Sequence, residues 1–228
     1  MSALRIEGDI LTPQGFVRGA LEHDDGRIRR IEGAPLTGEQ ARSEARTLVL
    51  PGFIDTHVHG GGGSDTMEGG EAIDVMARLH ARHGTTSLLA TTMTAPLAEV
   101  QAAMRALAPT CARRGRAAAR VLGVHLEGPY INPGKLGAQP DFVRAASIAE
   151  IRALHALAPI RLITLAPELP GNLDIIGALR AAGFQVQIGH TLGSYEDGVA
   201  ALERGAGGFT HLFNAMTAMH HRAPGIVG

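Results

Sequence analysis

An alternation of strand-like and helix-like segments constrains the fold of this chain more than any other feature. From residue 51 onward, short apolar or β-branched runs are each followed by a loop and then by a segment with helical spacing of apolar residues. Strict alternation of this kind predicts a parallel sheet whose strands are connected by covering helices. The predicted strands are 53–57, 85–90, 121–126, 160–166, 184–189 and 208–211.

The number of predicted strands favours an incomplete barrel. A closed (β/α)8 barrel takes about 250 residues, whereas 178 residues lie at positions 51–228. Six strands cannot close an eight-stranded ladder, and an open parallel edge is an aggregation hazard. We therefore expect residues 51–228 to be an incomplete (β/α)8 TIM barrel of about six βα units, the front part of a longer protein. A six-stranded open α/β fold is the alternative.

The first 50 residues follow a different pattern. Alternating apolar and polar residues at 4–11 and 27–32 indicate strands, and turn-forming residues at 12–15 and 24–26 separate them. Three or four short strands are too few to be stable alone. We expect residues 1–50 to be a partial small β domain, part of a β-sandwich, that packs on another part of the protein.

Two histidines end the first predicted strand of the barrel. His57 and His59 are separated by one residue, so both side chains point to the same face of a strand. The glycine run 60–63 follows, and glycine lets a ligand approach the main chain closely. Imidazole is the commonest protein ligand of metal ions, so the pair indicates half of a metal site. Two locally hydrogen-bonded polar residues at a strand end are the alternative.

Polar residues also end three other predicted strands. His125 and Glu127 end the third strand, His190 follows the fifth, and His211 ends the sixth. The carboxyl ends of barrel strands meet at one mouth, where active sites lie. Imidazole nitrogen and carboxylate oxygen without thiolate suit Zn²⁺ or Fe²⁺ in a hydrolytic site. The sequence therefore predicts a metal centre at this mouth, with His125 deeper in its strand and supporting.

Composition limits the partners that the chain can have. The formal net charge is −1, which gives no reason to expect nucleic acid or a membrane surface as partner. Cys111 is the only cysteine, which favours a reducing compartment. The N-terminus does not resemble a signal peptide, and no apolar run reaches the length of about 20 residues that a membrane span needs. We therefore expect a cytoplasmic protein.

Several stretches of the sequence resemble a known family. PGFIDTHVH at 51–59 is similar to the opening signature of the metal-dependent amidohydrolase superfamily. Three narrower stretches are HLEGPYINPGKLGAQ at 125–139, IGHT at 188–191, and THLFNAM at 210–216 leading to RAPG at 222–225. Together they resemble the N-acetylglucosamine-6-phosphate deacetylase family over essentially the whole chain.

The resemblance implies a role for each predicted metal ligand. Glu127, His190 and His211 match the principal metal ligands of the family. His57 and His59 match a pair that holds a second ion in members that have one. The implied cofactor is therefore a divalent metal, Zn or Fe, with one or two ions.

The resemblance also implies substrate contacts. Ala138, Gln139, Asn214 and Ala215 match positions that contact the sugar and its acetamido group. Arg222 matches an arginine that binds the phosphate across the interface of a homodimer, and a guanidinium suits a phosphate dianion. A solvated loop arginine is the alternative for Arg222. The implied partner is a phosphorylated N-acetylamino sugar.

The implied reaction is metal-dependent hydrolysis of the acetamide of N-acetylglucosamine-6-phosphate to glucosamine-6-phosphate and acetate, in amino-sugar catabolism. The family's general-base aspartate is expected beyond Gly228, so the 228-residue chain alone is expected to be inactive and poorly soluble. Three alternatives remain. They are an N-acetylgalactosamine-6-phosphate deacetylase, a cyclic-amide amidohydrolase, against which Glu127 on the third strand argues, and a non-catalytic truncated remnant that binds metal.

Overall fold

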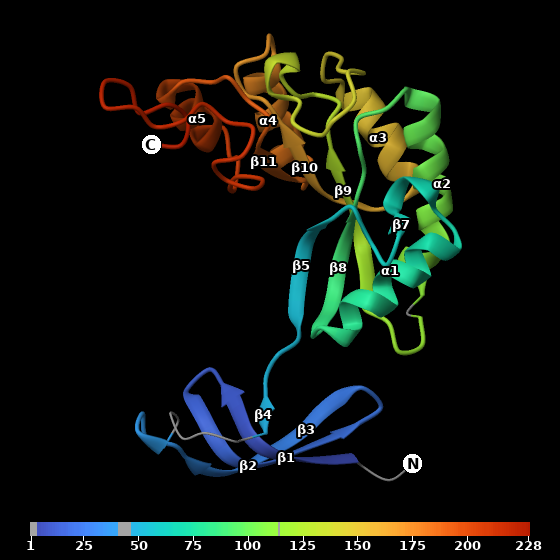
Figure 1. The fold of residues 1–228 in the computed structure, drawn as a ribbon, viewed down its shortest axis with the longest axis vertical. Helices are drawn as coiled ribbons and strands as arrows, with labels where there is room; N and C mark the ends of the chain where they lie inside the picture. Colours follow the sequence, from blue (N-terminus) through green and yellow to red (C-terminus); the bar gives the residue numbers. More distant parts are fainter. Residues whose placement is uncertain (1–3, 41–46, 114) are drawn as a thin grey trace. The chain divides into compact units, whose positions relative to one another are not determined.

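The chain divides after residue 52 into two units of different architecture, Met1–Gly52 and Phe53–Gly228 (Figure 1). The computed structural model describes residues 4–40, 47–113 and 115–228. Residues 1–3 and 41–46 of the predicted small β domain therefore lie outside the described residues. None of the described helices is long and apolar enough to cross a membrane.

The first unit contains a four-stranded sheet with the order β3-β2-β1-β4. β1 pairs antiparallel with β2, and β2 pairs antiparallel with β3, whereas β4 runs parallel to β1. The strands are β1 (Leu4–Thr12), β2 (Gly15–Asp24), β3 (Arg27–Pro35) and β4 (Leu48–Val49).

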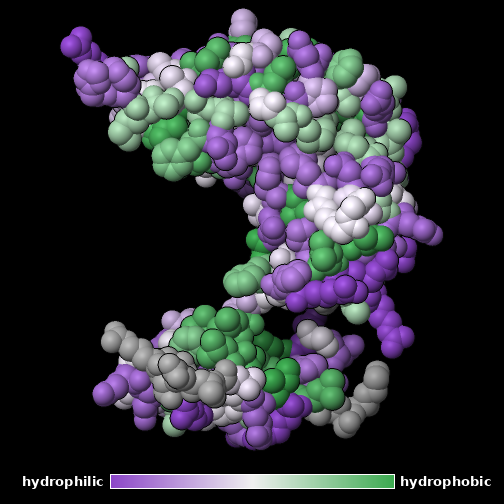
Figure 2. Space-filling model, in the orientation of Figure 1, coloured by the Kyte–Doolittle hydropathy of each residue, from purple (hydrophilic) through white to green (hydrophobic). Residues whose placement is uncertain are grey.

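An ion pair between β1 and β2 contributes to this sheet. Several apolar side chains of the same strands are exposed. Asp9 is 2% exposed and lies opposite Arg18, which donates to both carboxylate oxygens over 2.9 and 3.2 Å. A buried carboxylate needs such a partner. Figure 2 shows a patch of hydrophobic residues on the visible face of this unit. The exposed large apolar side chains of its strands are Leu4, Ile6, Leu11, Ile28, Ile31 and Leu48.

The second unit is a curled parallel sheet with helices against its outer face (Figure 1), which confirms the predicted class of an incomplete α/β barrel. The spatial order β11-β10-β9-β8-β5 repeats the chain order in reverse, and every neighbouring pair is parallel. The strands are β5 (Phe53–Val58), β8 (Thr85–Thr91), β9 (Arg120–Glu127), β10 (Ile160–Leu165) and β11 (Gln185–Ile188).

The helices form where apolar residues recur with helical spacing. In α1, Ile73, Met76 and Ala77 are buried at spacings of three and four residues. Ser147 and Ser194 cap the first turns of α3 and α5 through their hydroxyl groups. The helices are α1 (Glu71–Arg82), α2 (Leu97–Ala112), α3 (Ile148–Leu157), α4 (Asn172–Ala181) and α5 (Tyr195–Glu203). Shorter elements are β6 (Gly60–Gly61), β7 (Ser64–Asp65), and the 3₁₀ helices η2 (Thr66–Glu68) and η3 (Pro133–Lys135).

The sixth predicted strand, 208–211, is reduced to one parallel bridge between Phe209 and Ile188. Ile188 N–H donates to the carbonyl of Gly208, and Thr210 N–H donates to the carbonyl of Ile188, both over 2.9 Å. The pairing ends there because His211 has a φ of +36°, outside the β region. The described residues therefore contain five barrel strands and the start of a sixth.

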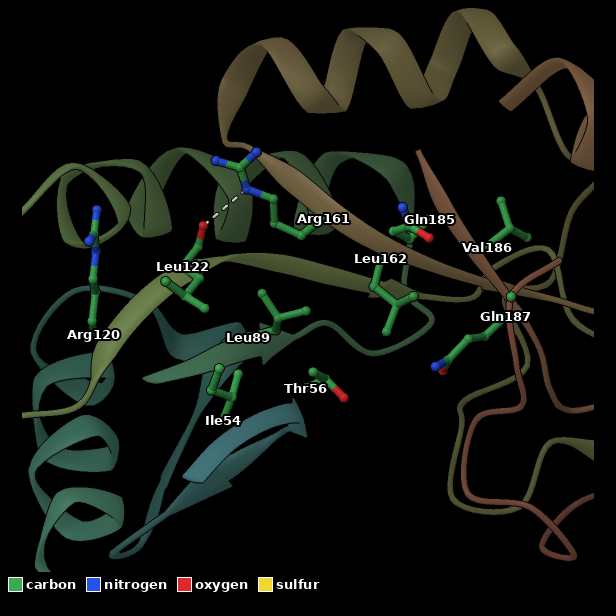
Figure 3. A pocket seen from close by; sticks show the side chains of 11 residues that line it. Ile54, Thr56, Leu89, Arg120, Leu122, Arg161, Leu162, Gln185, Val186 and Gln187 are labelled. Atoms are coloured by element: carbon green, nitrogen blue, oxygen red, sulfur yellow. Dashed lines mark hydrogen bonds between the residues drawn. The ribbon is translucent and has the colours of Figure 1, made fainter. Parts of the chain in front are cut away.

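A cavity lies on the inner face of the curled sheet, and its lining side chains are drawn in Figure 3. Ile54, Leu89, Leu122 and Leu162 line this cavity of about 540 Å³. In a closed barrel, inward-facing side chains fill a packed core. Here Ile54 is instead 63% exposed, and Arg161 Nε at the edge of the cavity donates to the carbonyl of Leu122 over 3.2 Å.

Candidate active site

The five predicted metal ligands lie at the carboxyl ends of four barrel strands. His57 is the next-to-last residue of β5 and His59 follows it, while Glu127 is the last residue of β9. His190 follows β11 by two residues, and His211 follows the bridge at Phe209. Because neighbouring parallel strands end at the same edge of a sheet, the fold brings these side chains together.

Glu127 is the centre of this group. Its side chain is 1% exposed, and its two oxygens face four imidazole rings. Nε2 of His59 lies 2.8 Å from Oε2. Nε2 atoms of His211, His190 and His57 lie 3.0, 3.1 and 3.9 Å from Oε1. All five predicted ligands therefore meet around one buried carboxylate.

The hydrogen bonds behind the rings fix which nitrogen faces Glu127. Nδ1 of His190 lies 2.8 Å from the carbonyl of Lys135, and Nδ1 of His59 lies 3.2 Å from the carbonyl of Thr91. A carbonyl only accepts, so each Nδ1 carries a hydrogen and each Nε2 of a neutral ring presents a lone pair. Ring N–H groups held by carbonyls are typical of metal-binding histidines.

This arrangement fits a bound cation. A lone pair on Nε2 and an ionised carboxylate are both acceptors, so their close approach requires a proton or a metal ion between them. Ligand atoms of His57, Glu127 and His211 all lie within 4.8 Å of one another. Nitrogen and oxygen donors without thiolate suit zinc or iron, so the group is a possible metal site.

The charges in the site favour an ionised Glu127. Burial opposes ionisation, but the close Nε2 atoms of His190, His211 and His59 outweigh it and hold the pKa of the Glu127 carboxyl below its usual range. The hydrogen bond to Glu127 raises the pKa of His211, while burial lowers the pKa of His57. The site therefore presents a fixed negative charge among histidines.

His125 lies behind the site and does not line its cavity. It is fully buried, and burial lowers its pKa to about 3, so the ring is neutral near pH 7. Nδ1 lies 3.2 Å from Nδ1 of His57 and 3.0 Å from the carbonyl of Thr56. Nε2 lies 2.6 Å from the hydroxyl of Thr164. His125 therefore contacts one predicted ligand without facing the others.

A cavity of about 430 Å³ opens over the five predicted ligands. Four of the predicted substrate contacts, Ala138, Gln139, Asn214 and Ala215, line it together with them. Arg222 does not line the cavity and is exposed.

The side-chain amide of Gln139 already has two protein partners. Its Nε2 donates to Oε2 of Glu127 over 2.7 Å, and its Oε1 accepts from the N–H of Thr94 over 2.6 Å. Gln139 is 6% exposed. The amide therefore orients the carboxylate at the centre of the site, a contact that its sequence position does not reveal.

Two residues that line the cavity were not predicted. Met93 follows the end of β8, and Gly137 lies in the loop after β9 with a φ of +57°. A Cβ on Gly137 would lie 3.7 Å from Cε1 of His190, so this backbone passes close to the ring. Met93 could have been found by treating the end of the second barrel strand like the other strand ends. Gly137 gives no such signal.

The residues that form the candidate site lie within a region that matches a known family. The Amidohydrolase family matches residues 48–224. N-acetylgalactosamine-6-phosphate deacetylase of Escherichia coli O157:H7 is 40% identical over 224 residues, which cover 96% of this chain and 58% of that protein. N-acetylglucosamine-6-phosphate deacetylase of Vibrio furnissii is 40% identical over 213 residues, which cover 92% of this chain and 51% of that protein.

Solved structures show the same likeness. An aspartate-to-alanine mutant of N-acetyl-D-glucosamine-6-phosphate deacetylase from Mycobacterium smegmatis, in complex with N-acetyl-D-glucosamine-6-phosphate, matches with a TM-score of 0.85 at 30% identity. The match covers 100% of this chain and 60% of that one. The Thermotoga maritima enzyme matches with a TM-score of 0.81 at 28% identity. The chain thus spans between half and about three-fifths of the length of these proteins.

Proposed function

The chain belongs to the Amidohydrolase family, and we propose that it is the metal-binding part of a deacetylase that hydrolyses N-acetylglucosamine-6-phosphate to glucosamine-6-phosphate and acetate. The observation that carries this proposal is the buried carboxylate of Glu127 with histidine Nε2 atoms from three other strand ends around it. The deacetylases among its relatives support the substrate class.

Glu127, His190 and His211 would hold a divalent ion, Zn or Fe. Their ligand atoms lie 3.0 to 3.1 Å apart, and the ring of His190 is already oriented by the carbonyl of Lys135. His57 and His59 would hold a second ion if two are bound. When bound, such an ion polarises an amide carbonyl and promotes the ionisation of water.

The loops above the site would hold the sugar. Ala138, Asn214 and Ala215 line the cavity and would contact the sugar and its acetamido group, as would Gln139 beside Glu127. Arg222 would bind the phosphate of a substrate in the neighbouring subunit of a homodimer. Its exposure outside the cavity of its own chain supports that assignment.

The proton transfers need a further carboxylate. Among the described residues that line the cavity, Glu127 is the only carboxylate, and it faces four histidine rings. An aspartate from outside these 228 residues would take the proton of the attacking water and give it to the leaving amine. We therefore expect the chain alone to bind metal without turning over substrate.

Metal analysis tests the metal site directly. Protein loaded with Zn²⁺ and then desalted should retain metal, and Glu127→Ala should lose it because the central ligand is gone. Glu203→Ala, which removes an exposed carboxylate on α5, is the matched control and should retain the wild-type content. Unchanged metal content in Glu127→Ala would refute the assigned role.

A chimera tests the reaction. The 228 residues followed by the remaining part of the Vibrio furnissii enzyme should release acetate from N-acetylglucosamine-6-phosphate, and Glu127→Ala in the chimera should abolish the release. The chain alone should release none. Turnover by the chain alone at the rate of the chimera would contradict the proposed division of roles.

N-acetylgalactosamine-6-phosphate is a second candidate substrate. The 40% identity to the Escherichia coli O157:H7 protein named for that sugar favours it as strongly as the Vibrio furnissii protein favours the glucosamine epimer. The added part of the chimera contributes to the site, so acetate release by the chimera reports on both proteins. Binding of both sugars to the chain itself, measured by calorimetry, is the cleaner comparison.

A cytoplasmic location agrees with this substrate class. A phosphorylated sugar is dianionic, and charged groups cross a bilayer only at high cost. The single cysteine also agrees with a reducing compartment.

A further inference from the structure

Glu168 lies in the loop between β10 and α4 and connects it to two neighbouring loops. Its Oε1 accepts from Nδ2 of Asn132 over 2.9 Å and from the N–H of Leu192 over 2.7 Å. Its Oε2 accepts from the hydroxyl of Thr191 over 2.5 Å. Asn132 follows β9, and Thr191 and Leu192 follow β11. One carboxylate therefore joins the loops after three successive strands.

All three donors flank His190. Thr191 and Leu192 are the next two residues in the chain, and the N–H of Asn132 donates to the carbonyl of His190 over 2.9 Å. Glu168 thus contacts the backbone after His190 directly at the N–H of Leu192, and it holds the side chain of Asn132, whose N–H binds the carbonyl of His190. Glu168 itself does not line the cavity over the metal site.

His190 needs such support because of its backbone conformation. Its φ is +50°, which is uncommon for a residue with a side chain and is maintained only where the surroundings enforce it. The imidazole position depends on that φ, since a return to a β or α conformation would turn Nε2 away from Glu127. The support comes from charge-assisted hydrogen bonds, which are about twice as strong as neutral ones.

The contacts of Glu168 are all to neutral donors. Among the described residues, no Lys, Arg or His makes an ion pair with it, in contrast to Glu150, which pairs with Arg144 over 2.8 Å. The charge of Glu168 is therefore directed at the loop groups that carry His190 and is not neutralised by a side-chain cation.

We infer that Glu168 is a positioning residue for the metal site, which holds His190 in the left-handed conformation that directs its Nε2 toward Glu127. This inference rests on the proposed metal site. Outer groups that orient a metal ligand typically contribute a factor of about 10 to 100 in metal affinity.

Zinc affinity tests the inference. The Kd for Zn²⁺ is measured by competition between the chain and a chromophoric chelator. Glu168→Ala should raise this Kd by about 10-fold or more. Glu203→Ala removes the same charge from the exposed face of α5 and should leave the Kd within about twofold, as expected of a surface substitution. A Kd for Glu168→Ala equal to that of Glu203→Ala would overturn the inference.

Two further measurements separate positioning from loss of folding. Glu168→Gln keeps the side-chain volume and an acceptor for Asn132 and Leu192 but presents an amide to Thr191. It should fold and still raise the Kd, by less than Glu168→Ala does. The visible absorption spectrum of bound Co²⁺, which reports ligand geometry, should change in both Glu168 variants and not in Glu203→Ala. An unchanged spectrum and Kd in Glu168→Gln, with Glu168→Ala unfolded, would mean that the residue is only structural.

Zn²⁺ binding by the wild-type chain separates failure of the proposed metal site from failure of the role proposed for Glu168. If wild type binds no Zn²⁺, the proposed metal site fails and the role of Glu168 fails with it. If wild type binds Zn²⁺ and the Glu168 variants bind it equally well, only the positioning role fails.

Discussion

A chain of buried hydrogen bonds lies directly behind the candidate metal site. Nε2 of His125 is 2.6 Å from the hydroxyl of Thr164, which is 2.6 Å from the hydroxyl of Thr210. Thr210 is also 2.8 Å from Oε1 of Gln187. Thr164 is fully buried and Thr210 is 2% exposed, so these groups have no access to water as an alternative partner. On the other side, His125 contacts His57.

Thr164→Val tests the importance of this chain. The substitution keeps the shape of the side chain but leaves Nε2 of His125 and the hydroxyl of Thr210 without their shared partner. We expect a loss of about 1–3 kcal/mol in the free energy of unfolding, measured by urea denaturation. Thr85→Val is the control: Thr85 is 8% exposed at the start of β8, and its hydroxyl has no partner among the hydrogen bonds of the described residues. Equal effects of both substitutions would contradict the expectation.

The thiol of Cys111 should react slowly. Burial raises its pKa to about 11, compared with about 8.5 for a free cysteine. At pH 8 the thiolate fraction is then about 200-fold lower, and the higher nucleophilicity of a more basic thiolate offsets only part of this. We expect alkylation by iodoacetamide to be at least about tenfold slower than that of a free cysteine in the same buffer. The rate should rise with pH up to about pH 11, and a plateau near pH 9 would contradict the raised pKa.

The convergence of the candidate ligands was predictable at the level of single residues because strand ends are visible in the sequence. His57, His190 and His211 each lie at or just after the end of a predicted strand, and this position brings them to one mouth. The contacts of Gln139 and Glu168 were not predictable in the same way. Both side chains act through loops whose paths depend on left-handed residues, and a sequence pattern does not specify those paths.

At the scale of elements, the ends of the paired barrel strands were predicted better than the extent of the segment 208–211. The first five predicted barrel strands agree with β5, β8, β9, β10 and β11 to within one residue at each end, as expected for apolar runs bounded by turn residues. The segment 208–211 was predicted as a strand because apolar and β-branched residues precede His211. Its extent depends on a neighbouring strand to complete the ladder, and among the described residues it has a partner on one side only, at Ile188.

The start of α5 carries a local helix start signal that can be tested. Ser194 Oγ accepts from the N–H of Asp197 over 3.2 Å, and Asp197 Oδ2 accepts from the N–H of Ser194 over 2.8 Å, which is a capping box. Ser194→Ala should lower the free energy of unfolding by about 1 kcal/mol, and Ser194→Asp by only a few tenths, because aspartate caps as well as serine. Thermal unfolding of the two variants beside wild type measures this. Equal losses would mean that capping is not the role of the hydroxyl.

At the scale of the whole second unit, the curled sheet exposes surface that a closed barrel would bury (Figure 3). Ile54 is 63% exposed, and Leu89, Leu122 and Leu162 line the same cavity. Among the described residues, β5 pairs with β8 alone, so this edge of the sheet is also open. An exposed apolar concavity beside a free edge is a site for dye binding and for aggregation.

Ile54→Lys measures whether this inner face is exposed in solution. If Ile54 is exposed as in the structure, the lysine costs little, and the free energy of unfolding should change by no more than about 0.5 kcal/mol. The fluorescence of bound anilinonaphthalene sulfonate should fall, and the chain should stay in solution at higher concentration, because the apolar patch is interrupted. Leu202→Lys, at a 45% exposed position on α5, is the control and should leave dye binding unchanged. A loss of about 2 kcal/mol or more in Ile54→Lys would instead show that protein covers Ile54 in solution, since burying a lysine ammonium is costly.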